Sequence, residues 1–320
     1  MKNILVIGSF GQIGSELTPE LRKRYGHSNV VAADLCIKKD NPFLSDGPVE
    51  KLDITDPQAI ADLVKKYKID TIFNMAAILS AVGEKKPQLA WNVGVNGIFN
   101  CLEVARELNC ALFTPSSIAA FGEGTPLNHT PQDTIQRPGT MYGVTKVTGE
   151  LLSDYYHKRF GVDSRSVRFP GIISNVTMPG GGTTDYAVEI YYEAIKKGHY
   201  TCFLSRRTFL DMMYMPDALN ASIQIMNADP SRLVHRNAFN IASMSLEPEM
   251  LATEIRKHIP DFTMDYAIDE VKQGIADSWP NSMDDSCARK EWDWKPEWNL
   301  TSMTEDMLKA IRQKQADGLI

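Results

Sequence analysis

The chain has 320 residues, of which 43% are hydrophobic and 23% are charged, and this composition is typical of one large globular domain or of two that share a core. The net charge is -6 and there is no dense run of Lys and Arg, so we do not expect nucleic acid as a partner. No stretch approaches the roughly 18 apolar residues of a membrane span, and residues 1–8 enter a strand without a charged leader, so we expect no membrane contact and no targeting segment.

Short β-branched runs alternate with helical stretches through the first half of the chain. This alternation predicts an α/β fold with a doubly wound parallel (Rossmann) sheet that has helices on both faces. The expected strands are Ile4–Ile7, Val30–Asp34, Val49–Leu52, Thr71–Asn74, Ala111–Thr114 and Ser164–Phe169. The expected helices are Gln12–Tyr25, Gln58–Tyr67, Pro87–Leu108 and Met141–Phe160, with Gly26 and Gly161 as C-terminal caps.

The alternation breaks after about Phe169, where a glycine run at residues 180–182 and clustered prolines follow. We expect a second, smaller lobe there that supplies contacts to a substrate. Residues 212–217, followed by a helical pattern to about Met226, indicate a return to the main sheet. The predicted division is therefore discontinuous, with residues 1–173 and about 210–240 in the Rossmann domain and about 174–209 and 241–320 in the substrate-binding lobe.

The glycines Gly8, Gly11 and Gly14 form a GxxGxxG pattern between the first strand and the first helix. Glycines there allow a tight turn and the close approach of a pyrophosphate, and the helix N-terminus offers free N–H groups and a partial positive charge. The alternative is a tight strand-to-helix turn without a ligand. The pattern makes residues 10–13 of this loop, which are Phe10, Gly11, Gln12 and Ile13, candidates for contact with a dinucleotide.

An acidic residue, Asp34, ends the second expected strand, twenty residues beyond Gly14. Its carboxylate can accept hydrogen bonds from both hydroxyls of an adenosine ribose and would repel a 2′-phosphate. Residues 35–37 carry no base, and the lysines at 38 and 39 come late, so NAD is favoured over NADP as the cofactor. Asp53 and Ile54 follow the third strand, where an acid could meet the adenine amino group or could instead be an acid at a helix N-terminus.

Two residues of one expected helix, Tyr142 and Lys146, are four positions apart and therefore share a face. An ammonium beside a phenol favours the phenolate, which can take a proton from an alcohol. Such a pair on its own is often a solvated helix face. Ser117 follows the fifth strand, at the edge of the sheet where ligands bind in this fold class, and could hold the same alcohol oxygen; a turn or a cap is its alternative.

Cysteine and histidine spacing argues against other site classes. The five cysteines are odd in number and lack CxxC spacing, so neither a disulfide framework nor a zinc knuckle is expected, and a reducing cytoplasm fits best. The six histidines never occur at the i,i+4 spacing that holds a metal on one helix face, so no metal site is predicted.

Taken together, these motifs and residues 74–77 resemble the extended short-chain dehydrogenase/reductase family, and the resemblance covers nearly the whole chain. Asp285, Ala288, Arg289, Trp294 and Pro296 are similar to the closing D...AR...W.P pattern of that family. Within it, residues 76–84, 180–187, 212–218 and 278–280 are similar to the NAD-dependent L-threonine 3-dehydrogenases of the short-chain type. The resemblance implies oxidation of the β-hydroxyl of L-threonine to 2-amino-3-ketobutyrate with NAD.

The resemblance also implies roles for individual residues. Ser117, Tyr142 and Lys146 would be catalytic, and Ser117, Tyr142, Ser80 and Thr184 would contact the substrate, with Thr183 and Trp279 as further candidates. The implied cofactor contacts are Gly8, Phe10, Gly11, Gln12, Ile13, Gly14, Asp34, Asp53, Ile54, Ala76, Ala77, Tyr142, Lys146, Phe169 and Ile172. Alignment to the following aromatic–Gly pair favours Ser117 over Ser116. The backbone N–H groups of the glycine run at 180–182 would suit the substrate carboxylate.

One position departs from the family pattern, because many members carry Asn where this chain has Gly94. Asn92 or Asn96 could compensate for it. The alternatives to a threonine dehydrogenase are a sugar-nucleotide epimerase or dehydratase with the same fold and cofactor, and a non-catalytic NAD-sensing protein. Relatives pair through two long helices, here about 87–108 and 141–160, so the resemblance implies a homodimer.

Overall fold

The computed structural model describes residues 1–37, 42–177 and 180–320. Its main sheet has six parallel strands in the order β3-β2-β1-β4-β5-β7. They are β1 (Ile4–Ile7), β2 (Val30–Asp34), β3 (Val49–Lys51), β4 (Thr71–Asn74), β5 (Ala111–Phe113) and β7 (Ser164–Arg165). The strand order reverses direction between β1 and β4, which confirms the doubly wound sheet and places a ligand crevice at the carboxyl ends of these two strands.

Helices cover both faces of this sheet, and each layer has its own buried cluster. The helices of this domain are α1 (Gly14–Tyr25), α2 (Pro57–Tyr67), α4 (Pro87–Trp91), α5 (Gly97–Leu108), α6 (Met141–Phe160) and α8 (Met215–Asn227). α1 and α8 contribute to a cluster with Ile4 and Val6, and α2 and α5 contribute to a cluster with Leu5 and Ile7. Successive residues of β1 thus point to opposite layers, which is why the strand is apolar throughout.

Two predicted elements are interrupted in the structure. The helix expected over 87–108 contains a π-helical turn, Asn92–Asn96 (η3), between α4 and α5. The strand expected over 164–169 divides at Ser166 into β7 and β8 (Val167–Phe169), and β8 leaves the main sheet to pair with β6 (Ser116–Ser117) and β12 (Phe239–Asn240).

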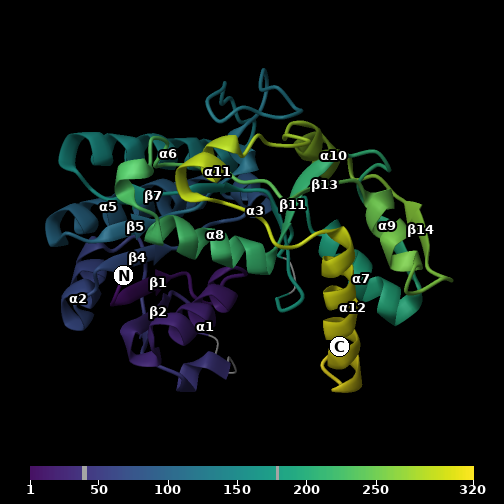
Figure 1. Cartoon of the computed structure of the whole chain (residues 1–320), viewed down its shortest axis with the longest axis horizontal. Coiled ribbons are helices and arrows are strands. Elements are labelled where there is room, and N and C mark those ends of the chain that lie inside the picture. Colours follow the sequence, from purple (N-terminus) through teal and green to yellow (C-terminus); the bar gives the residue numbers. More distant parts are fainter. Residues whose placement is uncertain (38–41, 178–179) are drawn as a thin grey trace.

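The second lobe lies at the other end of the molecule, where α7, α9, β14 and α12 are grouped to the right in Figure 1. Its elements are α7 (Tyr186–Lys197), β10 (His199–Cys202), α9 (Pro248–Arg256), β14 (Thr263–Tyr266), α10 (Glu270–Asp277) and α12 (Leu300–Ala316). β10 and β14 form a parallel pair, and α7, α9 and α12 enclose one buried cluster. The core of the lobe is therefore continuous with Ile118, Ala119 and Phe121 of the main domain.

A three-stranded sheet joins the two parts, in the order β13-β11-β9. Its strands are β9 (Gly171–Ile173), β11 (Leu210–Tyr214) and β13 (Met244–Leu246). The prediction that residues 212–217 return to the main sheet is therefore wrong for the strand, whereas α8, which follows it, does pack on the main domain. The remaining elements among the described residues are α3 (Ser80–Lys85), α11 (Ser286–Trp292) and four short 3-10 turns at His27–Asn29, Pro42–Ser45, Ile118–Ala120 and Pro230–Arg232.

One segment that we assigned to the substrate lobe packs elsewhere. Ala288 and Trp292 of α11, and Trp294 after it, belong to the buried cluster of Ile4 and Val6 in the main domain. The closing part of the chain thus crosses back over the main sheet before α12 enters the lobe. Within the described residues, every helix is too short or too polar to span a membrane.

Candidate active site

The glycine loop after β1 folds closely against itself and against the end of β4. Gly8 has a φ of +80°, and a Cβ at that residue would lie 2.7 Å from the backbone nitrogen of Ala76. A Cβ at Gly14 would lie 2.1 Å from the Gly8 carbonyl oxygen. Neither position can accept a side chain, so the loop leaves bare backbone and the N-terminus of α1 facing the crevice.

Asp34 at the end of β2 is tied to this loop. Its Oδ2 accepts the Phe10 N–H at 3.0 Å and its Oδ1 accepts the Cys36 N–H at 3.1 Å. Each carboxylate oxygen has a second lone pair and can still accept a ribose hydroxyl. The Phe10 side chain is buried with Ala32, so only its backbone belongs to the loop surface. The lysines at 38 and 39, used to argue for NAD over NADP, lie outside the described residues.

Asp53 and Ile54 occupy the turn before α2. Asp53 is exposed, and its Oδ1 accepts the Thr55 N–H at 2.9 Å and the Thr55 hydroxyl at 2.8 Å. The helix cap is Asp56, which accepts the Ala59 N–H, and not Asp53. The Ile54 side chain is buried in the core, where a Cβ on Gly97 would lie 3.0 Å from it, so a contact of Ile54 with adenine would come from its backbone.

The N-terminus of α6 is pinned against the segment that follows β6. Thr140 caps the helix by accepting the Gly143 N–H at 3.1 Å, and Glu84 of α3 accepts the Met141 N–H at 2.6 Å. A Cβ at Gly143 would lie 2.2 Å from the Ala119 carbonyl oxygen, so only glycine permits this approach. The contact brings the first turn of α6, with Tyr142, next to the turn that begins at Ser117.

The three residues predicted to be catalytic lie together. Lys146 Nζ is 5.3 Å from the centroid of the Tyr142 ring and donates to the Pro115 carbonyl at 2.8 Å. Ser117 Oγ accepts the Ala119 N–H at 3.2 Å, which fixes its side chain at the start of the turn Ile118–Ala120. The neighbouring Ser116 hydroxyl instead donates to the buried Glu150 carboxylate, which favours Ser117 as the serine that serves the site.

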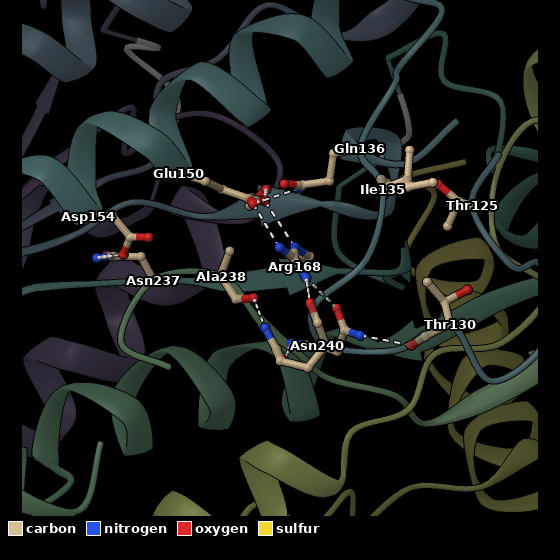
Figure 2. A network of polar contacts seen from close by, with 12 residues as sticks. Thr125, Thr130, Ile135, Gln136, Glu150, Asp154, Arg168, Asn237, Ala238 and Asn240 are labelled. Carbon is tan, nitrogen blue, oxygen red and sulfur yellow. Dashed lines mark hydrogen bonds and ion pairs between the residues drawn. The ribbon is translucent and has the colours of Figure 1, made fainter. Parts of the chain in front are cut away.

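Glu150 belongs to a buried polar network behind the site (Figure 2). Arg168 donates to both of its carboxylate oxygens, at 3.0 and 2.8 Å, and Gln136 donates to it at 2.7 Å. Arg168 also donates to Asn240 Oδ1 at 2.9 Å. Both charged side chains are buried, and such a pair is retained when its remaining polar groups are satisfied, as here. The network holds α6, β6, β8 and β12 in fixed relation one helical turn beyond Lys146.

A cavity of about 300 Å³ lies between the main domain and the lobe. The predicted residues that line it are Gly11, Gln12, Ile13, Gly14, Ala77, Ser80, Ser117, Tyr142, Lys146, Phe169, Ile172, Thr183, Thr184 and Trp279. The predicted residues outside its lining are Gly8, Phe10, Asp34, Asp53, Ile54 and Ala76. The second set lies along the glycine loop and the ends of β2, β3 and β4, where the adenosine half of an extended dinucleotide would run.

The glycine run of the lobe is not available as predicted for a substrate carboxylate. The N–H groups of Gly181 and Gly182 donate to Asp185 Oδ2, at 2.8 and 2.5 Å. Burial raises the pKa of Asp185, and these two hydrogen bonds act in the opposite direction. Asp185 also lines the cavity. The carboxylate therefore folds the glycine run onto the start of α7 and occupies the donors itself.

Six lining residues had no individual role assigned from the sequence, although all except Pro115 lie within the motif segments, namely Met75, Leu79, Pro115, Ile118, Pro170 and Gly171. Gly171 is the most informative of them, because a Cβ there would lie 2.4 Å from Met212 Sδ and 2.7 Å from Thr184 Cγ2. Met212 pairs in register with Gly171 across β9 and β11. The missing side chain at 171 is replaced by these two neighbours, which close this wall of the cavity.

Gly94, the departure from the family pattern, lies in the π-helical turn and faces α6. A Cβ there would lie 2.9 Å from both Cβ and Oγ1 of Thr145, so a larger residue would require one of the two helices to shift. Asn96 donates to Asn92 at 3.1 Å, and both are exposed. Neither lines the cavity, so the structure does not support their predicted compensation for the missing asparagine.

The geometry of the glycine loop is sufficient to show that these residues suit a bound dinucleotide. The space that a Cβ would need at Gly8 and Gly14 is taken by backbone, and backbone N–H groups are the donors that a pyrophosphate requires. Asp34 offers acceptors at the distance along the chain expected for a ribose. The site therefore carries both the binding elements of NAD and, at the far end of the same crevice, a Tyr/Lys/Ser group.

Comparison with known proteins agrees with this arrangement. A sequence model of the NAD dependent epimerase/dehydratase family matches residues 4–242. An uncharacterized epimerase/dehydratase from Staphylococcus saprophyticus is 53% identical over 315 residues, covering 98% of this chain and 98% of that protein.

Solved structures of similar proteins are more specific about activity than the family model is. L-threonine dehydrogenase from Clostridium difficile is 57% identical with a TM-score of 0.97, covering 98% of both chains. L-threonine dehydrogenase from Phytophthora infestans is 48% identical with a TM-score of 0.94, covering 98% of this chain and 100% of that one. A UDP-glucose 4-epimerase from Thermotoga maritima has a TM-score of 0.83 at 18% identity, which shows the shared fold alone.

Proposed function

We propose that this chain, which belongs to the NAD dependent epimerase/dehydratase family, oxidises L-threonine at its β-hydroxyl to 2-amino-3-ketobutyrate with NAD as the acceptor. The observation that carries the proposal is the meeting of Ser117, Tyr142 and Lys146 with the glycine loop in one cavity. The similarity to solved L-threonine dehydrogenases over nearly the whole chain supports the choice of alcohol.

Proton transfer is assigned to the first turns of α6. Tyr142 as phenolate takes the proton of the substrate hydroxyl, and the Ser117 hydroxyl donates to the same oxygen and fixes its position. The Lys146 ammonium, held by the Pro115 carbonyl, favours the negative charge on the neighbouring tyrosine. NAD, when bound, supplies the acceptor for the hydrogen and the electron pair that leave the β-carbon.

The polar atoms of the lobe would hold the amino-acid part of the substrate. Ser80 and Thr184 offer hydroxyl groups in the cavity, whereas the N–H groups of Gly181 and Gly182 already donate to Asp185. An ammonium is attracted by the one carboxylate that lines the cavity, Asp185, among the residues that the structure describes. This gives Asp185 a role in substrate binding that its sequence context did not indicate.

The size of the cavity argues against a sugar nucleotide. Gly171, Met212 and Thr184 close one wall, and the total volume of about 300 Å³ is at the lower end for a pocket that binds a small ligand. A nucleoside diphosphate sugar would need space beyond that of the nicotinamide and a small alcohol. A non-catalytic NAD sensor would not need Tyr142 and Lys146 in contact within the cavity.

The test is a spectrophotometric assay of NADH with L-threonine, together with an assay of epimer formation from UDP-glucose, because an epimerase returns the hydride to the sugar and releases no net NADH. We expect NADH from L-threonine only, and Tyr142→Phe should lower kcat by a factor of about 100 to 10,000 while NAD binding is retained. Turnover of UDP-glucose would favour an epimerase, and NAD binding without turnover of either compound would favour the sensor. Full activity of the Tyr142→Phe variant would refute the assignment of the base.

We further assign a homodimer to the exposed apolar faces of α5 and α6. Phe99, Leu151, Tyr155 and Phe160 are 43–63% exposed there, with Tyr155 and Phe160 in edge-to-face contact. Large apolar side chains gathered on neighbouring helices commonly mark an interface.

The five cysteines are free thiols, three of them buried, which supports a reducing cytoplasm as the compartment.

A further inference from the structure

Metal-binding types of side chain from three chain segments meet on the main domain, outside the cavity. Cys287 and Glu291 lie one turn apart on α11, and His235 lies in the segment between the turn Pro230–Arg232 and β12. One ligand atom from each of these three residues lies within 4.8 Å of the other two. A fourth group, Asp133, comes from the loop before α6, and its Oδ2 is 3.3 Å from His235 Nε2.

Glu291 fixes the orientation of the His235 ring. Its Oε1 lies 2.5 Å from His235 Nδ1, and its Oε2 accepts the N–H groups of Val234 at 2.6 Å and of His235 at 2.9 Å. The Glu291 side chain is buried, and it accepts a hydrogen bond from the Nδ1–H of the ring, which leaves Nε2 directed away from it. A carboxylate that orients a histidine in this way is the usual outer partner of a metal-binding histidine.

The opposite side of the ring faces a second carboxylate. With Nδ1 directed at Glu291, the Nε2 atom is left for a cation, and Asp133 Oδ2 lies 3.3 Å from it. The carboxylates of Glu291, Asp284 and Asp133 lie near the Cys287 thiol, and a divalent cation bound there would offset their negative charge.

We propose that His235 Nε2, Cys287 Sγ and the Asp133 carboxylate bind a divalent cation of the zinc class, with Glu291 as the group that orients the histidine. Nitrogen, sulfur and oxygen donors together suit zinc better than magnesium or calcium. Tetrahedral zinc needs its ligand atoms roughly 3.3–3.9 Å apart, so the cluster has to contract, and Asp133, which is 84% exposed, is free to rotate inward.

The site would have a structural effect and no part in the chemistry. Asp133 directly follows Gln132, whose carbonyl accepts from Arg168 and whose side chain donates to the Ala238 carbonyl. A cation bound to Asp133 and to α11 would therefore fasten the loop that supports the Glu150–Arg168 network. None of its ligands lines the cavity, so basal turnover should not depend on them.

The test uses the full chain, freed of metal by a chelator, kept reduced and titrated with Co²⁺ and then Zn²⁺. We expect a thiolate-to-cobalt charge-transfer band that Zn²⁺ removes, and a higher melting temperature with Zn²⁺ than without it. Cys287→Ser should abolish the band, and Asp133→Asn should weaken Zn²⁺ binding by about tenfold or more. Cys36→Ser, which removes an exposed thiol elsewhere, is the matched control and should behave as the unmodified chain.

Three outcomes would overturn the proposal. One is the absence of any change with either ion, which would mean that the cluster binds no divalent cation. Another is a cobalt band of equal strength in the Cys287→Ser chain. The third is a Zn²⁺-dependent melting temperature that neither Cys287→Ser nor Asp133→Asn alters. Asp133 is exposed and Cys287 is only partly buried, so both variants should fold.

Discussion

Replacing Gly94 by the asparagine of many relatives tests how tightly the catalytic helix is positioned. A Cβ at residue 94 would lie 2.9 Å from Thr145, and ordinary van der Waals contact begins at 3.4 Å. Thr145 Oγ1 donates to the Tyr142 carbonyl at 2.7 Å, so displacement of Thr145 is passed to the tyrosine. Either the π-helical turn or α6 has to move by about half an ångström, before the amide of the new side chain is counted.

Gly94→Asn should therefore destabilise the chain and slow its chemistry. Overpacking of this kind costs about 1–3 kcal/mol of unfolding free energy. A misplacement of about 1 Å at a reacting group can cost about 100-fold in rate, so half that distance should lower kcat by about tenfold. The measurements are chemical unfolding and NADH formation from L-threonine at saturating NAD, with NAD affinity expected to stay the same.

Gly97→Ala is the matched control, because it adds a methyl group one turn further along the same helix. That methyl would meet the Ile54 side chain at 3.0–3.1 Å and not α6. We expect a similar loss of stability with kcat unchanged. The reasoning is refuted if Gly94→Asn keeps full kcat, or if Gly97→Ala lowers kcat as much as Gly94→Asn does.

Three further predictions follow from single side chains. Asp34→Ala should weaken NAD binding by about 10- to 100-fold, since hydrogen bonds to a charged group are worth about 1.5–3 kcal/mol, and should reduce the discrimination against NADP; an unchanged ratio of the two KM values would contradict the ribose assignment. Burial raises the pKa of Asp211 from 3.8 to about 7, so the folded chain holds a proton that the unfolded chain has lost, and stability should fall by up to about 4 kcal/mol as pH rises from about 4 to about 7. Asp211→Asn should remove most of this dependence in urea unfolding, leaving the part from Glu16, whose pKa burial also raises to about 7; an unaltered pH profile would exclude Asp211 as its source. Leu151→Glu should convert the proposed dimer to a monomer in light scattering, and an unchanged mass would place any interface elsewhere.

The main sheet could be predicted from the sequence because its strands are apolar on both faces. The bounds expected for β1, β2 and β4 are those of the structure, and the helix expected at 141–160 is confirmed to the residue. The expected strand 164–169 was wrong because β7 and β8 are both buried, and burial alone does not reveal that the chain changes sheets at Ser166. Nor does any residue type predict the π-helical turn at 92–96, where Gly94 packs against Thr145 of another helix.

The catalytic residues could be predicted from the sequence because they lie at fixed positions in regular elements. Tyr142 and Lys146 are related by helical spacing, and Ser117 by its place after a strand of the sheet. The wall formed by Gly171, Met212 and Thr184 could not be derived in this way, since it depends on the register between β9 and β11. Contacts within one element follow from the local sequence, whereas contacts between elements need the tertiary fold.

The glycine run at 180–182 shows why a donor-rich segment does not by itself identify a ligand site. Asp185 is only three and four residues from the N–H groups it accepts, so closing this small loop costs little chain entropy, whereas a free carboxylate must also lose its translational freedom. The internal carboxylate therefore competes well for these donors. An anionic part of a substrate would therefore bind to Lys146 or to hydroxyl groups such as those of Ser80 and Thr184. A cationic part would be attracted by Asp185. A zwitterionic amino acid meets both requirements in one molecule.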